Sequence, residues 1–231
     1  MTEAQNQPAK ERFKVVYPER FLSELDKADK NLDKPFIRNA LDFATKAHEG
    51  QMRQSGEPYI IHPIGVALVL LDLQMDTHSI CAGLLHDVLE DTPITEDEMT
   101  NEFGETVTQL VCGVTKIGKI KFSSKAEEQA ENLRKMLLAM TDDVRVILIK
   151  LADRLHNMLT LGAVPPQKQR RKAQETLDVY VPLAHRLGIY RLKTEMEDLC
   201  LRYIEPNVYF DLVRRVAQKR RSRQRFVDEL N

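Results

Sequence analysis

The chain has 231 residues, and its 34 Lys and Arg against 35 Asp and Glu leave a formal net charge of −1, which argues against a protein whose whole surface binds nucleic acid. Hydrophobic residues make up 42% of the chain and Gly and Pro together only 19 residues, which favours a folded, mostly helical protein over a disordered one. Three scattered cysteines and an N-terminus without an apolar core predict a soluble protein of the reducing cytoplasm, with no disulfide framework, signal peptide or membrane span.

Helical periodicity runs through most of the chain, and no alternating strand stands out. The first 14 residues are polar and are predicted to be flexible. Helices are predicted, in chain order, at 18–30, 34–49, 64–74, 77–90, 95–102, 105–116, 126–140, 142–161, 167–187, 189–203 and 206–229. A short hairpin near 117–122 is an alternative to a loop there. The pattern predicts an all-α bundle of about ten helices.

The predicted helix at 142–161 carries two distinct stripes. Its apolar residues recur at helical spacing and form one face, as expected for packing on a core. Asp153, Asn157 and Thr160 recur at spacings of four and three and form a separate polar stripe. Such a stripe either meets solvent or lines a site.

A second polar cluster lies in the predicted helix at 77–90 and just after it. His86, Asp87, Glu90 and Asp91 lie on the face opposite to the leucines of this segment. Like charges this close repel each other, and a bound cation removes that repulsion. The adjacent His86 and Asp87 can hold one ion together only near a helix end or if both side chains reach inward.

Two further residues are candidate ligands for the same cation. His62 lies at a predicted loop–helix boundary, and Asp153 lies on the polar stripe. Two imidazoles and two carboxylates suit manganese, iron or zinc. The absence of a thiolate from this set disfavours a closed structural zinc site.

The ordered set of His62, His86-Asp87 and Asp153 resembles the HD superfamily of metal-dependent phosphohydrolases. Longer stretches resemble the N-terminal (p)ppGpp hydrolase domain of the RelA/SpoT homologues over about residues 15–210. They read HEGQ, SGEPYI with Arg53 before it, LLHD followed by EDT, RVILIKLADRLHNM, and ETL followed by AHRLG.

The resemblance implies an all-α HD fold and removal of the 3′-pyrophosphate of (p)ppGpp, which gives GDP or GTP and pyrophosphate. It implies that Mn²⁺ is bound by His62, His86, Asp87 and Asp153. Water activation and proton transfer fall to Glu90 and Asp91, although the sequence does not say which residue does which. The residues expected to bind the nucleotide are Arg53, which packs on the guanine, and Ser55, Asn157 and Thr160, which line its pocket.

Two departures from the family pattern stand in the matching stretches. Gln54 stands where the family commonly has a second basic residue, which predicts one weaker contact to the phosphates or the base. Cys112 stands where an acidic residue is usual, with no expected effect on the chemistry. His48 and His156 also fall in these stretches, either as residues that orient the ligands or as structural histidines.

The resemblance also predicts a domain organisation. A hydrolase domain is expected over 15–204, and a basic helical connector over 205–231 toward a synthetase domain that lies outside this chain. Contact with the ribosome is expected only through regulatory regions outside the chain, and neither DNA nor a membrane is an expected partner. Two other functions stay open: an HD phosphohydrolase of another nucleotide, and a non-catalytic module that senses (p)ppGpp.

Overall fold

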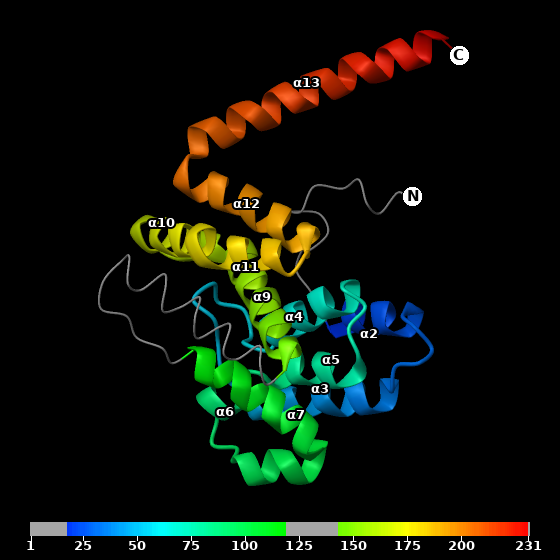
Figure 1. Ribbon diagram of the computed structural model, residues 1–231, viewed down its shortest axis with the longest axis vertical. Coiled ribbons are helices and arrows are strands. Elements are labelled where there is room, and N and C mark those ends of the chain that lie inside the picture. Colours follow the sequence, from blue (N-terminus) through cyan, green and yellow to red (C-terminus); the bar gives the residue numbers. More distant parts are fainter. Residues whose placement is uncertain (1–17, 119–142, 231) are drawn as a thin grey trace. The chain divides into compact units, whose positions relative to one another are not determined.

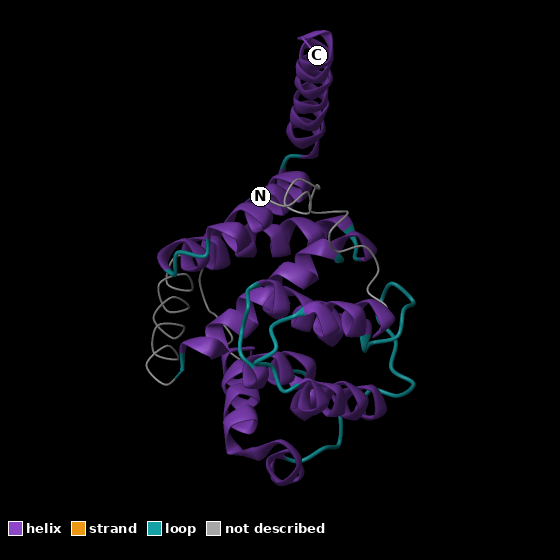
Figure 2. Cartoon of the chain, turned by 90° about the vertical axis from the view of Figure 1, so that its right-hand side faces the viewer, coloured by secondary structure: helices purple, strands orange, loops and turns teal. Residues whose placement is uncertain are grey.

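The computed structural model describes residues 18–118 and 143–230 (Figure 1). Every regular element in these ranges is helical, as Figure 2 shows, and the one β contact there is an isolated bridge between Met52 and Pro58. The all-α prediction is therefore confirmed. The chain divides into two compact units, one ending at Val164 and the other beginning at Pro165. The predicted flexible segment 1–14 and the predicted helix 126–140 lie outside the described residues.

The first unit is a bundle around one apolar helix. Its elements are α2 (Pro18–Lys27), α3 (Lys34–Ala47), α4 (Ile61–Asp72), α5 (Thr77–Leu85), α6 (Val88–Asp91), α7 (Glu96–Gly118), α9 (Val144–Leu159) and a 3₁₀ turn (Leu161–Ala163). All residues of α4 from His62 to Leu70 are buried, and α4 packs against α2, α5 and α9. A helix that is apolar all round must lie in the core, and the candidate ligand His62 lies in the first turn of this helix.

Aspartates begin three of the helices in this unit. The carboxylates of Asp33, Asp76 and Asp143 accept hydrogen bonds from backbone N–H groups in the first turns of α3, α5 and α9. These bonds satisfy backbone donors that have no partner inside the helix. Arg145 then joins two of the caps, since its guanidinium lies 2.6 Å from Asp143 and 2.8 Å from Asp76. The start of α9, which carries Asp153, is thereby tied to the start of α5.

Two boundaries next to the candidate ligands differ from the prediction. The helix predicted at 77–90 is wrong as one element, because α5 ends at Leu85 and α6 begins at Val88, so that His86 and Asp87 form the junction. The helix predicted to begin at residue 64 begins at Ile61, since a proline such as Pro63 is tolerated in a first turn where its missing N–H is not needed.

The break predicted between 95–102 and 105–116 is confirmed. Gly104 interrupts α7 with a φ of 77°, a left-handed conformation that glycine adopts without steric cost. Helix α7 then continues to Gly118, so the first two residues of the hairpin considered at 117–122 are helical. The rest of that segment lies outside the described residues.

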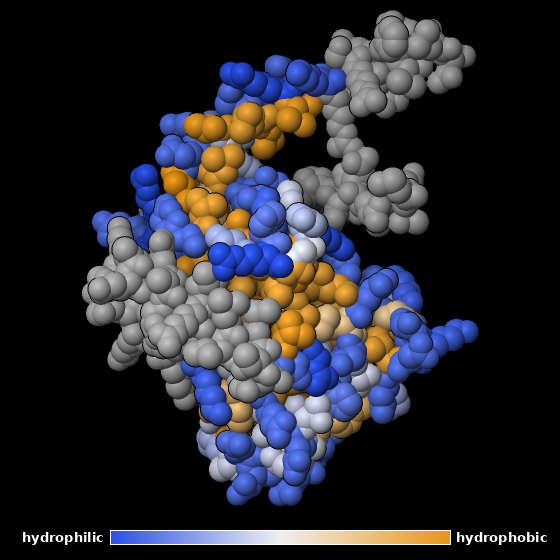
Figure 3. Space-filling model, viewed as in Figure 1, coloured by the Kyte–Doolittle hydropathy of each residue, from blue (hydrophilic) through white to orange (hydrophobic). Residues whose placement is uncertain are grey.

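The second unit contains α10 (Pro166–Glu175), a π-helical turn (Thr176–Tyr180), α11 (Val181–Arg186), α12 (Tyr190–Ile204) and α13 (Pro206–Leu230). The single helix predicted at 167–187 is confirmed, since the backbone is helical without a break from Pro166 to Arg186, but the π-helical turn inside it was not predicted. Pro182 cannot donate a backbone hydrogen bond, and the π turn with its wider bonding pattern lies directly before it. The predicted helix at 206–229 is confirmed as α13, which exposes Val208, Phe210 and Val216 along the orange stripe near the top of Figure 3. Among the described residues, no helix combines the length and apolar character needed to cross a membrane.

Candidate metal centre and nucleotide site

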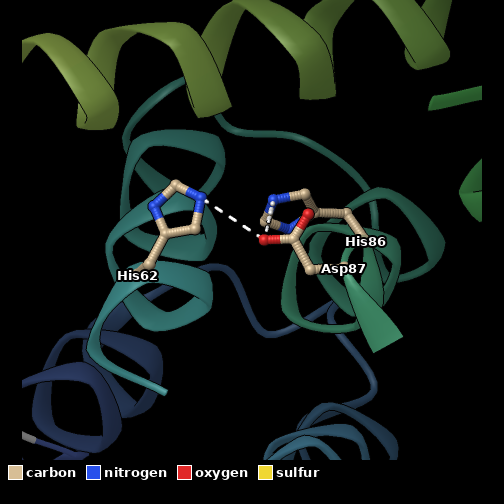
Figure 4. Close-up of side chains that lie close together, drawn as sticks. All are labelled: His62, His86 and Asp87. Carbon is tan, nitrogen blue, oxygen red and sulfur yellow. Dashed lines mark ion pairs between the residues drawn. The ribbon is translucent and has the colours of Figure 1, made fainter. Parts of the chain in front are cut away.

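The junction between α5 and α6 turns two neighbouring side chains toward one point (Figure 4). The Nδ1 atom of His86 donates a hydrogen bond to the carbonyl oxygen of Gly83 at 2.8 Å. A carbonyl can only accept, so the proton is on Nδ1 and the lone pair of Nε2 is available in the neutral ring. This Nε2 lies 3.2 Å from Oδ2 of Asp87. The helix break thus gives one nitrogen and one oxygen ligand side by side.

His62 and Asp153 complete this cluster from α4 and α9. The Nε2 atom of His62 lies 3.2 Å from Oδ1 of Asp153 and 3.6 Å from Oδ2 of Asp87. Nε2 of His86 lies 4.0 Å from the same Asp153 oxygen. Ligand atoms of His62, His86 and Asp87 all lie within 4.8 Å of one another. The structure therefore brings together the four residues that the sequence proposed as ligands.

The donor atoms of this cluster fit a divalent metal ion. Nε2 of His86 is buried and has no hydrogen-bond partner in the described part of the chain. In the neutral ring its lone pair faces a carboxylate oxygen, and two acceptors repel each other unless a proton or a cation lies between them. A cation would satisfy the nitrogen and both carboxylates at once. The mixed nitrogen and oxygen set is typical of manganese, iron or zinc.

The pKa values within the cluster follow from burial and charge. Burial opposes the charged form of His86, but Asp87 and Asp153 outweigh it and raise its pKa to about 9. Burial lowers the pKa of His62, whose imidazolium would also repel His86. The pKa values of both carboxyls are lowered against the effect of burial, for Asp87 mainly by His86 and for Asp153 mainly by Lys150. Both acids are thus ionised, and a bound cation would take over the positive charge that His86 otherwise provides beside them.

The side chains around Asp153 and His62 hold these two ligands in place. Lys150 lies 2.7 Å from Oδ2 of Asp153, and the amide of Asn157 donates to Oδ1 at 2.5 Å. The Nδ1 atoms of His62 and His156 share a hydrogen bond of 2.8 Å. Burial, followed by the charges of His62 and Arg53, holds the pKa of His156 far below its usual value, so His156 is neutral. Partners of this kind fix the orientation of metal ligands.

The acidic pair lies on α6 next to the cluster. Glu90 and Asp91 are exposed, and Tyr59 joins this helix to Asp87. The Tyr59 hydroxyl lies 2.6 Å from Oδ2 of Asp87 and 2.9 Å from Oδ2 of Asp91. Burial and the charge of Asp87 raise the pKa of Tyr59 far above its usual value, so the phenol keeps its proton. The acidic pair is therefore linked to the candidate metal centre through one hydroxyl group.

The residues expected to bind the nucleotide are only partly brought together. Nη2 of Arg53 donates to Oδ1 of Asn157 at 3.4 Å and to Oγ1 of Thr160 at 3.3 Å, and its Nη1 is buried without a hydrogen-bond partner among the described residues. Asn157 contacts Asp153, so this wall adjoins the metal centre. Ser55 is exposed, and its hydroxyl donates to Glu57 at 3.1 Å.

Two contributors escaped the sequence reasoning. Lys150 precedes Asp153 by three residues, so the same spacing argument that produced the polar stripe would have included it. Tyr59 lies in a loop, where no periodicity indicates which way a side chain points. Its position between two carboxylates depends on the path of the whole segment from Gln51 to Ile60.

Comparison with known proteins identifies the domain family that contains this site. Residues 40–190 match the HD domain family, and the chain belongs to that family. HD domains of this kind hold a divalent metal ion, and the cluster of His62, His86 and Asp87 fits one.

Individual relatives confirm the resemblance to the RelA/SpoT homologues. The chain is 52% identical over 194 residues to the bifunctional (p)ppGpp synthase/hydrolase SpoT of Escherichia coli, across 84% of this chain and 28% of that protein. It is 48% identical over 215 residues to the GTP pyrophosphokinase of Myxococcus xanthus, across 92% of this chain and 28% of that protein. The chain thus spans little more than a quarter of these relatives.

One solved structure is also similar. It is that of a metazoan SpoT orthologue described as hydrolysing ppGpp, and it matches with a TM-score of 0.53 and 27% identity. The match covers 71% of this chain and 93% of that one. The likeness therefore extends over nearly the whole of a protein that is named for this hydrolysis.

Proposed function

We propose that this chain removes the 3′-pyrophosphate of (p)ppGpp in a Mn²⁺-dependent hydrolysis that yields GDP or GTP and pyrophosphate. The observation that carries the proposal is the convergence of His62, His86, Asp87 and Asp153 on one buried point beside the acidic helix α6. The names of the relatives support the substrate, and one of them is a hydrolase that matches over nearly its whole length.

Each group has a distinct part in this proposal. His62, His86, Asp87 and Asp153 would hold the ion, which when bound lowers the pKa of a bound water and neutralises charge on phosphoryl oxygens. Water activation and proton transfer would be divided between the carboxylates of the exposed Glu90–Asp91 pair, so that neither residue can be lost without a loss of rate.

Arg53 and its neighbours would hold the nucleotide. A guanidinium is planar and can stack on a guanine while its N–H groups contact polar atoms at its edge. Its contacts to Asn157 and Thr160 already fix the plane beside the metal centre. We include Ser55 because it shares the loop of Arg53. The alternative is that the chain hydrolyses another nucleotide. Rates measured on a panel of nucleotides that includes dGTP distinguish it, since faster turnover of dGTP than of ppGpp would favour the alternative.

The test is pyrophosphate release from ppGpp by the purified chain in the presence of Mn²⁺. The variants Asp87→Ala and Glu90→Ala should lose at least about a hundredfold in rate, because loss of a ligand or base should exceed the effect of losing an outer partner. Asp42→Ala, at an exposed position of α3, is the matched control and should keep full activity. An active Asp87→Ala variant would overturn the assignment of the metal site. Binding of ppGpp without turnover at saturating Mn²⁺ would instead favour a sensing module.

The proposal also covers the domain organisation and the cellular location of the protein. We propose a hydrolase domain over 15–204, followed over 205–231 by a basic helical connector toward a synthetase domain, in a cytoplasmic protein. The much greater length of the Escherichia coli relative, which is named as both synthase and hydrolase, supports such a neighbour.

A further inference from the structure

The hydroxyl of Tyr59 lies between two carboxylates that have different parts in the proposed function. It is 2.6 Å from Oδ2 of Asp87, a candidate metal ligand, and 2.9 Å from Oδ2 of Asp91, a candidate base. A phenol carries a single hydrogen, so it can donate a full hydrogen bond to only one of these acids at a time. The two acids therefore compete for the same proton donor.

The Asp87 oxygen in this contact is also the oxygen that faces the metal centre. Oδ2 lies 3.2 Å from Nε2 of His86 and 3.6 Å from Nε2 of His62. A rotation of the carboxylate would carry Oδ2 away from both imidazoles. The bond to Tyr59 restrains that rotation, since a charge-assisted hydrogen bond of this length is short and directional.

Tyr59 is itself held on two sides. Its ring stacks on His48 with the centroids 4.7 Å apart and the planes inclined by 29°. Nδ1 of His48 lies 2.9 Å from Oε1 of Gln51. The side-chain nitrogen Nε2 of Gln51 donates a hydrogen bond to the backbone oxygen of Asp91 at 2.8 Å. The loop is thus fastened to α6 at two points, through Gln51 to the backbone and through Tyr59 to the side chain.

We propose that Tyr59 is a positioning residue that couples the metal centre to Asp91. Its hydroxyl holds Asp87 in the orientation that binds the ion. Once an ion shares the charge of Asp87, the same hydroxyl turns toward Asp91 and holds that carboxylate beside the attacking water. The part that concerns Asp91 rests on the proposed function, whereas the part that concerns metal binding does not.

The variant Tyr59→Phe tests this coupling because it keeps the ring and its stacking on His48 and removes only the hydroxyl. Tyr190→Phe makes the same chemical change at an exposed position of α12 and is the matched control. The Kd for Mn²⁺, by titration calorimetry, should rise about tenfold or more in Tyr59→Phe. The visible spectrum of the Co²⁺-loaded chain should change, because it reports the ligand geometry.

Steady-state kinetics on ppGpp test the second part. At saturating Mn²⁺, kcat should fall about tenfold in Tyr59→Phe while KM for ppGpp stays within about twofold, since the hydroxyl acts through other residues. In an Asp91→Asn background the same change should reduce kcat much less, because residues that act through one another are not additive.

Several results would overturn the coupling. An Mn²⁺ affinity, Co²⁺ spectrum and kcat equal to those of Tyr190→Phe would do so, as would fully additive effects in the double variant. A Tyr59→Phe chain that does not fold would make the hydroxyl a structural group and would also contradict the proposal. If the wild-type chain binds Mn²⁺ but releases no pyrophosphate, the proposed function fails, and the Mn²⁺ affinities still decide whether Tyr59 positions Asp87.

Discussion

The two halves of the candidate site differ sharply in burial. At the metal end, the residues His62, His86 and Asp153 are only 4%, 1% and 6% exposed. Each has a fixed neighbour: His156, the Gly83 carbonyl and Lys150 respectively. At the nucleotide end, Ser55, Glu90 and Asp91 are exposed and Arg53 is half-buried.

This difference fits what each half is proposed to bind. An ion needs several donors within a few tenths of an ångström of their working positions, which only packed helices can guarantee. Two ionised carboxylates in such a place are costly unless positive charge compensates them. A flexible nucleotide instead can be met by side chains that adjust from a loop and a short helix. The metal end is therefore built before any substrate binds.

The largest expected effect comes from a methyl group placed behind the metal end. A Cβ at Gly65 would overlap the ring of His156. The ring would have to move, and its hydrogen bond to His62 would be lost. We expect Gly65→Ala to weaken Mn²⁺ binding by about tenfold to a hundredfold, as for the loss of an outer-shell partner. Titration calorimetry measures this change without any substrate.

Overpacking also destabilises, so a control that overpacks the core away from the metal ligands is needed. A Cβ at Gly113 would lie 2.8 Å from Cγ2 of Val146, at the contact between α7 and α9. Both variants should lose about 1–3 kcal/mol of unfolding free energy. Only Gly65→Ala should lose metal affinity. Equal affinities in the two variants would show that the orientation of His62 does not depend on His156.

A smaller effect is expected at the nucleotide end from Arg53→Lys. The change keeps the charge and removes the planar group that contacts Asn157 and Thr160. KM for ppGpp should rise about tenfold, which corresponds to about 1.4 kcal/mol, while the Kd for Mn²⁺ stays unchanged. Steady-state kinetics together with calorimetry separate the two quantities, and Arg170→Lys, the same chemical change at an exposed position of α10, is the control.

A loss of Mn²⁺ affinity in Arg53→Lys would contradict the division into two halves. It would mean that the arginine supports Asp153 through Asn157, whose amide donates to that carboxylate. An unchanged KM would remove Arg53 from the nucleotide site altogether.

The sequence indicated which residues form the candidate metal end, but it did not predict how they are arranged. Asp153 and Asn157 follow from helical spacing alone, because α9 forms where its apolar stripe predicts. We expected His86 and Asp87 to bind one ion together only near a helix end, and they do lie at such an end, between α5 and α6. The predicted helix, however, ran through this junction to residue 90. No local signal marks that break, which arises where α5 and α6 pack around the cluster.

The loop that carries Tyr59 and Arg53 is the part that sequence patterns describe least. The predicted helices at 34–49 and 64–74 leave this segment between them as a loop, and Gly56 within it adopts a φ of 82°. Periodicity says nothing about side-chain direction outside helices and strands, so the Tyr59 contacts to two acids could not be foreseen. Helical spacing could have identified Lys150 as a partner of a metal ligand, but it could not have identified Tyr59.

The smallest effect concerns the ion pair between Arg145 and Asp143 at the start of α9, the helix that bears Asp153. The hydrogen bond from Arg145 to Asp143 is the main cause that lowers the pKa of this carboxyl below its ordinary 3.8. A lowered pKa means that the pair stabilises the fold above about pH 3.8 and that this contribution is lost as the pH falls through the folded pKa. Asp143→Asn should therefore lose about 0.5–1 kcal/mol of unfolding free energy at neutral pH, because the pair is half-buried and close to solvent. Its difference from wild type should vanish in acid, whereas Asp42→Asn on α3 should match wild type throughout. Urea unfolding followed by circular dichroism measures both differences, and a deficit in Asp143→Asn that persists at low pH would assign the effect to the lost cap instead of the charge.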